Sequence, residues 1–276
     1  MLFLNVLNPA QREAVETVDG PVMIVAGAGS GKTRVLTYRI AYLLHTGVPP
    51  YQILALTFTN KAAEEMKARI AALVGNGAKE LWVGTFHSVF ARILRRECDH
   101  IGFGRNFSIY DTADSSNVIK RIMSALNLSR QQYDAHAIRS HISFAKNRLA
   151  DAAAIQAQAS NPFEAVCAKV FVSYQQELKS NNAMDFDDLL LNTIDLFRTR
   201  AHVLSKYQER FRFILVDEYQ DTNHPQYVIL KALASKHGNL CVVGDDAQSI
   251  YAFRGADIRN MLDFQRDYSS ARVFRL

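Results

Sequence analysis

The residues best suited to chemistry lie in AGAGSGKT, residues 26–33, directly after the apolar run VMIVA. They fit a glycine, four residues and then Gly-Lys-Ser/Thr, with Ala26 replacing the leading glycine. Glycines let successive backbone N–H groups point at an anion, Lys32 suits β- and γ-phosphates, and the Thr33 hydroxyl suits Mg²⁺. The segment predicts a phosphate site rather than a glycine-rich turn with a chance lysine. The candidate residues are Ala26, Gly27, Ala28, Gly29, Ser30, Gly31, Lys32, Thr33 and Arg34.

Two adjacent carboxylates, Asp217 and Glu218, follow the apolar segment FILV at 213–216. In parallel α/β sheets, ligands bind beyond the carboxyl ends of the strands, which is also where the glycine loop belongs. Together with Thr33, Asp217 is a candidate Mg²⁺ ligand acting through water. Glu218 is a candidate base that orients and deprotonates an attacking water. An acidic turn after a core strand is the alternative.

A third polar segment, CVVGDDAQSIYAFRGA at 241–256, also follows an apolar run. Gln248 is a neutral group that could sense the γ-phosphate or its attacking water. Tyr251 and Phe253 stand beside Arg254, and such aromatics can stack on bases while an arginine pairs with a phosphate. From composition alone, an aromatic pair that fills the edge of the sheet is an equal alternative.

The elements that must position these groups alternate between strands and helices. Short apolar runs predict strands buried on both faces, and their alternation with helices predicts a parallel sheet and an α/β fold. Asn60 and Thr222 are candidate helix N-caps. The predicted strands are 22–26, 53–57, 81–85, 213–216 and 240–244, and the predicted helices are 32–47, 60–73, 86–101 and 223–236.

The stretch from about 109 to 183 differs from the rest of the chain. After FSIY it contains no convincing strand, and it has helix-period patterns such as SSNVIKRIMSALNL and EAVCAKVFVSYQQELKS. The 185 residues that separate Lys32 from Asp217 leave room for more than a few βα units. We therefore predict an all-helical insertion within the α/β domain.

Composition sets outer limits on the protein. The 276 residues are 49% hydrophobic and 21% charged, typical of a globular protein with a core. The net charge of +5 suits a nucleic-acid partner without proving one. The widely spaced cysteines form no metal or redox motif, indicate buried thiols and favour a reducing, cytoplasmic setting. We find no signal peptide and no run long enough to span a membrane.

The motifs together resemble superfamily 1A DNA helicases of the UvrD/PcrA/Rep family. Seven of them occur in the order found in that family and cover most of the chain outside the predicted insertion. They are LNPAQREAV (7–15), AGAGSGKT (26–33), ALTFTNKAAEEMKARI (55–70), GTFHSVFARIL (84–94), DFDDLL (185–190), LVDEYQDTN (215–223) and VVGDDAQSIYAFRGADI (242–258).

The resemblance implies roles for further residues. Gln11 matches a glutamine that recognises adenine, and Arg39 matches a residue that lines the adenine side. Tyr251 and Phe253 match base-stacking aromatics, although the family usually has tryptophan at the second position, and Arg254 matches an arginine near the γ-phosphate and DNA. The implied contacts to single-stranded DNA are Phe58, Thr59, Asn60, Thr85, Phe86 and His87.

Some of these implied DNA contacts have simpler structural alternatives. His87 can be a hydrogen-bond donor at the start of a helix. Phe58 can be a core residue, and Asn60 can be only a cap.

The resemblance also implies a domain organisation and an activity. A RecA-like P-loop domain, subdomain 1A, would comprise residues 1–108 and 184–276, and the insertion 109–183 would be subdomain 1B. ATP, Mg²⁺, single-stranded DNA and junctions between single and double strands are the implied ligands, with 3′-to-5′ movement. We expect an N-terminal part of a longer helicase, poorly active without the second RecA-like domain.

Other function classes stay open at this point. A non-catalytic nucleic-acid-binding module is disfavoured by the intact Lys32, Asp217 and Glu218. The helicase part of a RecB/AddA-type helicase–nuclease would share these motifs. A nucleotide kinase or GTPase would lack the paired Asp-Glu and the DNA-type motifs after the second and third predicted strands.

Overall fold

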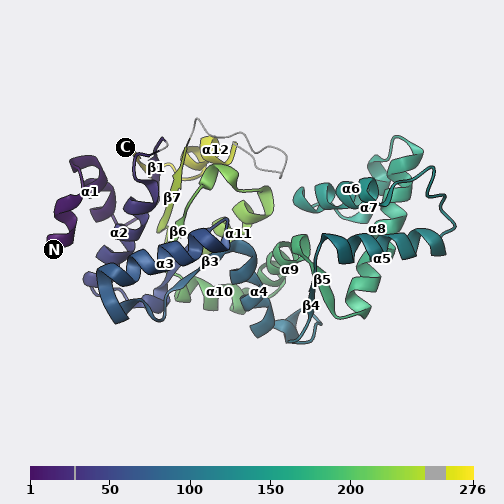
Figure 1. Cartoon of the computed structure of the whole chain (residues 1–276), viewed down its shortest axis with the longest axis horizontal. Helices are drawn as coiled ribbons and strands as arrows, with labels where there is room; N and C mark the ends of the chain where they lie inside the picture. The colour runs from purple at the N-terminus through teal and green to yellow at the C-terminus, as the bar shows by residue number, and fades with distance from the viewer. Residues whose placement is uncertain (28, 246–258) are drawn as a thin grey trace. The chain divides into compact units, whose positions relative to one another are not determined.

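A computed structural model gives the structure of the chain and describes residues 1–27, 29–245 and 259–276 (Figure 1). The chain divides into two compact units. The first contains Met1–Val89 and Arg200–Leu276, and the second contains Phe90–Thr199. Within the described residues, no helix is both long and apolar enough to cross a membrane.

The first unit is built on a six-stranded sheet in the order β3-β2-β6-β7-β1-β8. All neighbouring strands run parallel, as predicted. The five predicted strands are confirmed, whereas β8 was not predicted. The strands are β1 (Val22–Val25), β2 (Ile53–Thr57), β3 (Trp82–Thr85), β6 (Phe213–Val216), β7 (Leu240–Gly244) and β8 (Arg272–Arg275).

Both faces of this sheet are covered, which explains the unbroken apolar runs. On one face, Ile24, Ala55 and Leu215 share a core cluster with residues of three helices. The alternate positions, such as Leu54 and Val216, are also buried. The helices of the first unit are α1 (Pro9–Glu16), α2 (Lys32–His45), α3 (Asn60–Val74), α10 (Ala201–Arg210), α11 (His224–Ala234) and α12 (Arg259–Asp267), and α4 (Phe86–Arg96) crosses the division between the units.

The helices agree with the predicted ranges, but both predicted N-caps are wrong by one residue. The Thr59 hydroxyl, not Asn60, accepts the capping bond from the N–H of Ala62. Asn223 forms the capping box of α11, while the hydroxyl of the buried Thr222 donates to a carbonyl of the preceding turn. Asn60 is already the first residue of its helix, and Thr222 closes the preceding 3-10 turn, so the capping position falls on the neighbour in each case. The helix predicted over 86–101 ends at Arg96.

The second unit contains five complete helices and two short parallel strands, β4 (Ser108–Tyr110) and β5 (Ala183–Asp185). The strands lie at the predicted ends of the insertion, and the regular structure described between them is helical. The second unit also includes residues 90–108 and 184–199, which lie outside the predicted insertion, so the predicted domain limits stay a prediction. The helices are α5 (Thr112–Ala125), α6 (Ala135–Asn147), α7 (Ala152–Gln158), α8 (Pro162–Ser180) and α9 (Phe186–Thr199).

Short 3-10 turns connect several elements. They are η1 (Leu2–Val6), η2 (Pro50–Gln52), η3 (Gly75–Ala78), η4 (Cys98–His100) and η5 (Tyr219–Asp221).

The cysteines confirm one prediction about the core. All three are free and buried, as their spacing predicted.

Candidate functional site

The carboxyl ends of β1, β7 and β6 bring three segments together. These strands are neighbours in the sheet, so the residues that follow them meet at one edge. The glycine loop follows β1, Asp245 follows β7, and Asp217 and Glu218 follow β6. The glycine loop near the N-terminus and the residues after β6 and β7, far along the sequence, therefore contribute to one site.

The glycine loop has the backbone that its sequence predicted. Gly29 and Gly31 have φ angles of 77° and 94°, in the region that favours glycine, and Gly31 is the N-cap of α2. Ser30 bonds back to the carbonyl of Gly27 through both its N–H and its hydroxyl. Helix α2 begins at Lys32, so its N-terminal N–H groups open toward the loop.

Ala26 occupies the position where the phosphate-loop pattern has a glycine. Its side chain is buried in the core cluster, and its N–H donates to the carbonyl of Gly244 at 3.0 Å. The residue therefore extends the strand pairing of β1 and adopts no left-handed backbone. This explains why alanine is compatible with the loop. Ala28 lies outside the described residues.

Lys32 lies between two carboxylates. Its Nζ is 3.4 Å from Oε2 of Glu218 and 3.4 Å from Oδ2 of Asp245. At the next residue of α2, Oγ1 of Thr33 is 3.5 Å from Oδ2 of Asp217. The structure thus brings together the lysine, the hydroxyl and both predicted carboxylates, and it adds Asp245.

The carboxyl group of Asp217 has an unusual acidity. Burial raises its pKa to about 6, and the negative charge of Glu218 acts in the same direction, whereas Lys32 opposes it. Glu218 has a φ of 49°, a left-handed conformation that non-glycine residues rarely adopt. Three carboxylates, those of Asp217, Glu218 and Asp245, are therefore packed around one lysine, which is an arrangement suited to a bound cation.

Two residues of this site escaped sequence reasoning. Asp245 is the first acidic residue of GDDAQ, a segment in which only Gln248 is predicted from the sequence as a site residue. Gln220 donates to Glu218 and accepts from the backbone N–H of Asp245. A buried strand end followed by a polar residue was the available signal for Asp245, whereas the position of Gln220 depends on the turn after Glu218.

Gln11 and Arg39 connect helix α1 to the glycine loop and to α2. The amide of Gln11 donates to the carbonyl of Ser30 at 2.9 Å and accepts from the N–H of Asn8. It retains a second N–H and an oxygen lone pair with which it could pair with an adenine. Arg39 is buried and donates to the carbonyl of Ala14 at 2.6 Å, so it fastens α1 to α2.

The predicted DNA contacts follow β2 and β3, which pair with Thr57 opposite Thr85. Phe58 is half-buried, and its ring centroid lies 5.5 Å from that of Phe86. Phe86 itself is 1% exposed, so it supports Phe58 from the core. The two segments therefore lie side by side at the same edge of the sheet.

Polar groups complete this pair of segments. Thr59 and Asn60 are exposed, and Thr85 accepts from the N–H of Ser88 at 3.2 Å. Burial lowers the pKa of the half-buried His87 below its usual value. This edge therefore offers aromatic, hydroxyl, amide and neutral imidazole groups.

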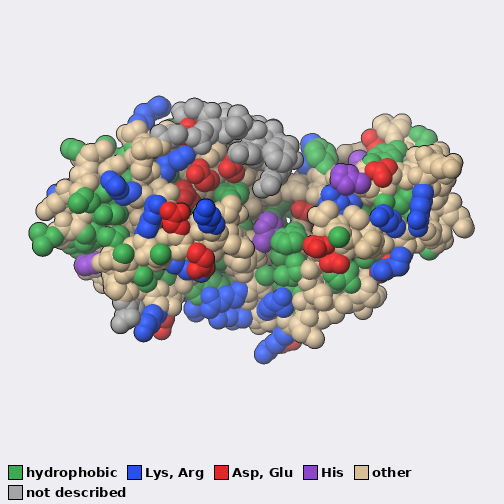
Figure 2. Space-filling model, viewed as in Figure 1, with side chains coloured by type: hydrophobic (Ala, Val, Ile, Leu, Met, Phe, Trp, Pro, Cys, Tyr) green, Lys and Arg blue, Asp and Glu red, His purple; other side chains and the backbone are tan. Residues whose placement is uncertain are grey.

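Four predicted site residues, Gln248, Tyr251, Phe253 and Arg254, lie outside the described residues, and their roles stay predictions. On the face shown in Figure 2, lysine and arginine side chains are scattered among acidic ones instead of forming one continuous patch. The net charge of +5 therefore does not by itself locate an interface.

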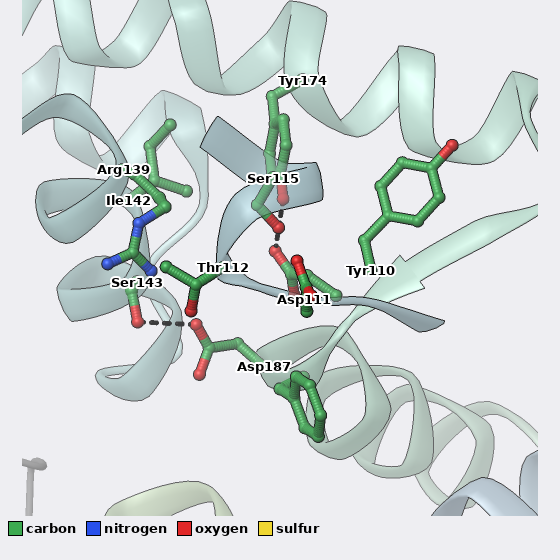
Figure 3. Close-up of a pocket in the computed structure, with 11 residues that line it drawn as sticks. Tyr110, Asp111, Thr112, Ser115, Arg139, Ile142, Ser143, Tyr174 and Asp187 are labelled. Carbon is green, nitrogen blue, oxygen red and sulfur yellow. Dashed lines mark hydrogen bonds between the residues drawn. The ribbon is translucent and has the colours of Figure 1, made fainter. Parts of the chain in front are cut away.

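The motif DFDDLL serves the packing of the second unit. Lys146 is completely buried, and its Nζ lies 2.7 Å from Asp185 and 2.8 Å from Asp188. The hydroxyl of Tyr174 also donates to Asp185. Figure 3 shows the adjoining cavity, where Ser143 of α6 donates to Asp187 at 2.7 Å. These bonds join α6 and α8 to the segment where β5 passes into α9.

A family model described as the UvrD/REP helicase N-terminal domain matches residues 7–269. The chain belongs to this family. The predicted resemblance to the UvrD/PcrA/Rep helicases is therefore confirmed, and so is the predicted fold class. The UvrD/REP helicase N-terminal domain is a RecA-like P-loop fold, consistent with the parallel sheet and the glycine loop.

Several relatives in the UvrD/REP helicase family are named ATP-dependent DNA helicase PcrA. The one from Bacillus subtilis (strain 168) is 52% identical over 275 residues, which is 99% of this chain and 37% of that protein. The one from Staphylococcus aureus (strain Mu50 / ATCC 700699) is 51% identical over 275 residues, 99% of this chain and 38% of that protein. The chain spans less than two fifths of the length of these relatives.

Proposed function

We propose that this chain is the ATP-binding motor part of an ATP-dependent DNA helicase, the activity named in its relatives. The observation that carries the proposal is the meeting of the glycine loop with the acidic strand end. Lys32 lies 3.4 Å from Glu218, and Thr33 lies 3.5 Å from Asp217. A triphosphate held by the loop has its terminal phosphate beside Lys32, and therefore near the carboxylate of Glu218.

The proposed reaction is hydrolysis of ATP with Glu218 as general base. The oxygen of a water attacks the γ-phosphorus, and the bond from that phosphorus to the β–γ bridging oxygen breaks. ADP leaves with the bridging oxygen, and one proton of the water passes to the Glu218 carboxylate before it is released to solvent. Lys32 contributes positive charge where the phosphate oxygens become more negative.

The residues at this site fit a Mg²⁺ ion. Thr33 and Asp217 offer hydroxyl and carboxylate oxygens, the ligand types that Mg²⁺ prefers. The raised pKa of Asp217 indicates a crowded negative site that a cation would relieve. When bound, Mg²⁺ neutralises charge on the phosphates. We propose that Thr33 and Asp217 hold it.

We propose that single-stranded DNA binds along the ends of β2 and β3. The half-buried Phe58, the exposed Thr59 and Asn60, and the adjoining Thr85 and His87 support this placement. In the whole helicase, Tyr251 and Phe253 would stack on bases and Arg254 would lie near the γ-phosphate and DNA. Movement in the 3′-to-5′ direction and a preference for single–double strand junctions rest on the family resemblance.

The proposal extends to the division of labour within the protein. Residues 1–108 with 184–276 would be subdomain 1A, and residues 109–183 would be subdomain 1B. The resemblance implies that fast turnover needs an arginine from a second RecA-like domain. A polypeptide of residues 1–276 alone should therefore bind ATP and Mg²⁺, hydrolyse ATP slowly and leave DNA duplexes intact. The buried free thiols support a cytoplasmic setting.

Calorimetric titration of the chain with ATP, with and without Mg²⁺, tests the proposal. We expect Mg²⁺ to strengthen binding and Asp217→Asn to remove that gain. Lys32→Ala should weaken ATP binding by roughly 10- to 150-fold, because a charge-assisted contact contributes about 1.5–3 kcal/mol. Lys67→Ala is the control, because Lys67 is exposed on α3 and pairs with Glu64. Absence of ATP binding would favour a non-catalytic nucleic-acid-binding module.

A further inference from the structure

Gln220 lies in η5, directly after the acidic strand end, and is 2% exposed. Its amide forms two hydrogen bonds. Nε2 donates to Oε2 of Glu218 at 2.7 Å, and Oε1 accepts from the backbone N–H of Asp245 at 3.1 Å. Because Glu218 follows β6 and Asp245 follows β7, one buried side chain connects two neighbouring strand ends at the phosphate site.

These bonds orient the Glu218 carboxylate. Its Oε2 accepts from Gln220 and faces Lys32, whereas its Oε1 has no hydrogen bond to any described residue. The backbone of Glu218 is in the left-handed region, which turns the chain so that Gln220 folds back over the site. One carboxylate oxygen is thus held by the protein, and the other is left to accept a proton.

Gly244 makes room for this arrangement. A Cβ at this position would lie 2.9 Å from Oε1 of Gln220 and 3.0 Å from the sulfur of Met261. Both distances are shorter than an ordinary van der Waals contact between a Cβ and a neighbouring atom. The φ angle of Gly244 is not in the left-handed region, so close approach, and not backbone conformation, explains the glycine.

We infer that Gln220 is a positioning residue for ATP hydrolysis, one that holds Glu218 in place to take a proton from the attacking water. The inference rests on the proposed function and deepens it. A general base must lie within hydrogen-bond reach of the proton that it removes. Misplacement by about 1 Å can cost roughly 100-fold in rate.

The side chain of glutamine suits both bonds. The side-chain amide is at once a donor, toward the carboxylate, and an acceptor, from the backbone. In Gln220→Ala both bonds are lost. In Gln220→Glu the donor is lost, and a carboxylate faces Glu218. In Gly244→Ala the amide remains, but the new methyl group displaces it.

The test measures ATP affinity and hydrolysis separately in the chain. Calorimetry gives the Kd for ATP with Mg²⁺, and single-turnover assays with protein in excess over labelled ATP resolve slow hydrolysis. We expect Gln220→Ala and Gly244→Ala each to slow hydrolysis by roughly 10- to 100-fold, with ATP affinity within about 3-fold of wild type. The double variant should be no slower than the slower single variant, because both changes break one link.

The matched control is Gln208→Ala. Gln208 is also a buried glutamine of the first unit, and its amide joins α10 to α11 by bonds to Ala232 and Ser235. Its loss should lower the melting temperature and leave hydrolysis unchanged. If Gln220→Ala does not fold, Gly244→Ala and Gln220→Glu provide the same comparison.

The outcomes separate this inference from the proposed function. A wild-type chain that does not bind ATP overturns both. If wild type binds and hydrolyses ATP, unchanged hydrolysis in Gln220→Ala overturns only the inference. So does a parallel loss of ATP affinity and rate, or a double variant whose effect is the product of the two single effects.

Discussion

His87 follows β3 and is half-buried at the start of α4. Burial lowers the pKa of its imidazole below the usual 6.5, so the side chain is neutral at pH 7. We expect an NMR titration of the chain to place its midpoint below 6.5. As the pH falls, the unfolded chain takes up this proton first. The free energy of unfolding should therefore decrease from pH 6.5 down toward the folded pKa.

A comparison with His87→Gln isolates this effect. The variant keeps a hydrogen-bonding side chain but cannot be protonated, so the part of the pH dependence due to His87 should disappear. As a neutral group, His87 would also contribute nothing to the salt dependence of DNA binding, which reports on cationic contacts. A midpoint at or above 6.5 would contradict the assignment.

The phosphate-site residues differ in how far sequence predicts them. Lys32, Asp217 and Glu218 were predictable because each follows an apolar run, and the ends of parallel strands meet at one edge. Gln220 was not, because its two bonds depend on the left-handed turn at Glu218. The residue at the turn gives no sign of it, because Glu218 is a glutamate and positive φ is most common for glycine, asparagine and aspartate.

Lys146 connects the elements of the second unit. Burial lowers the pKa of its ammonium group, but the charges of Asp185 and Asp188 more than compensate and raise it overall. Lys146→Ala leaves both carboxylates buried without their cation, and we expect a loss of about 3–5 kcal/mol in the free energy of unfolding. Urea denaturation followed by circular dichroism measures this loss.

Two further variants test the cause. Lys120→Met, on the exposed side of α5, should change stability little. Replacing the cluster together, with Lys146→Met, Asp185→Asn and Asp188→Asn, should recover much of the loss, because no charge stays buried. Since the Lys146 pKa is raised, its contribution is complete below pH 10.5 and declines as pH rises through the folded value. A Lys146→Ala variant as stable as wild type would contradict the proposed stabilising role of Lys146.

Strands that are buried along their whole length are readily predicted from the sequence. The strands at 53–57 and 240–244 are buried throughout, so both faces require apolar residues. In contrast, among the strands that the structure describes β8 pairs only with β1, and of its four residues only Phe274 is buried. The three-residue β5 passes directly into the DFDDLL motif. Neither has a long enough apolar run to be predicted from pattern alone.

Across the first unit, the sheet order assigns the two proposed binding functions to different strands. The ends of β1, β7 and β6 carry the phosphate side, and those of β2 and β3 carry the DNA side. The two sides meet between β2 and β6, where the backbone N–H of Asp217 donates to the carbonyl of Leu56 at 2.9 Å. Asp217, whose carboxylate is the proposed Mg²⁺ ligand, is thus hydrogen-bonded through its backbone to the strand that leads to Phe58.

Because the two proposed sites lie on different strands, a variant at one site should lower the affinity for one ligand only. Phe58→Leu keeps apolar packing on Phe86 but removes a stacking ring. It should weaken binding of a labelled oligonucleotide by roughly 5- to 150-fold, equivalent to about 1–3 kcal/mol, and leave the Kd for ATP within about 3-fold. Lys32→Ala should weaken ATP binding and leave oligonucleotide binding, measured without nucleotide, within about 3-fold of wild type. Fluorescence anisotropy and calorimetry measure the two affinities. If either variant lowers both affinities equally, the sheet edge is a single shared site, and the assignment of ATP and DNA to different strands is wrong.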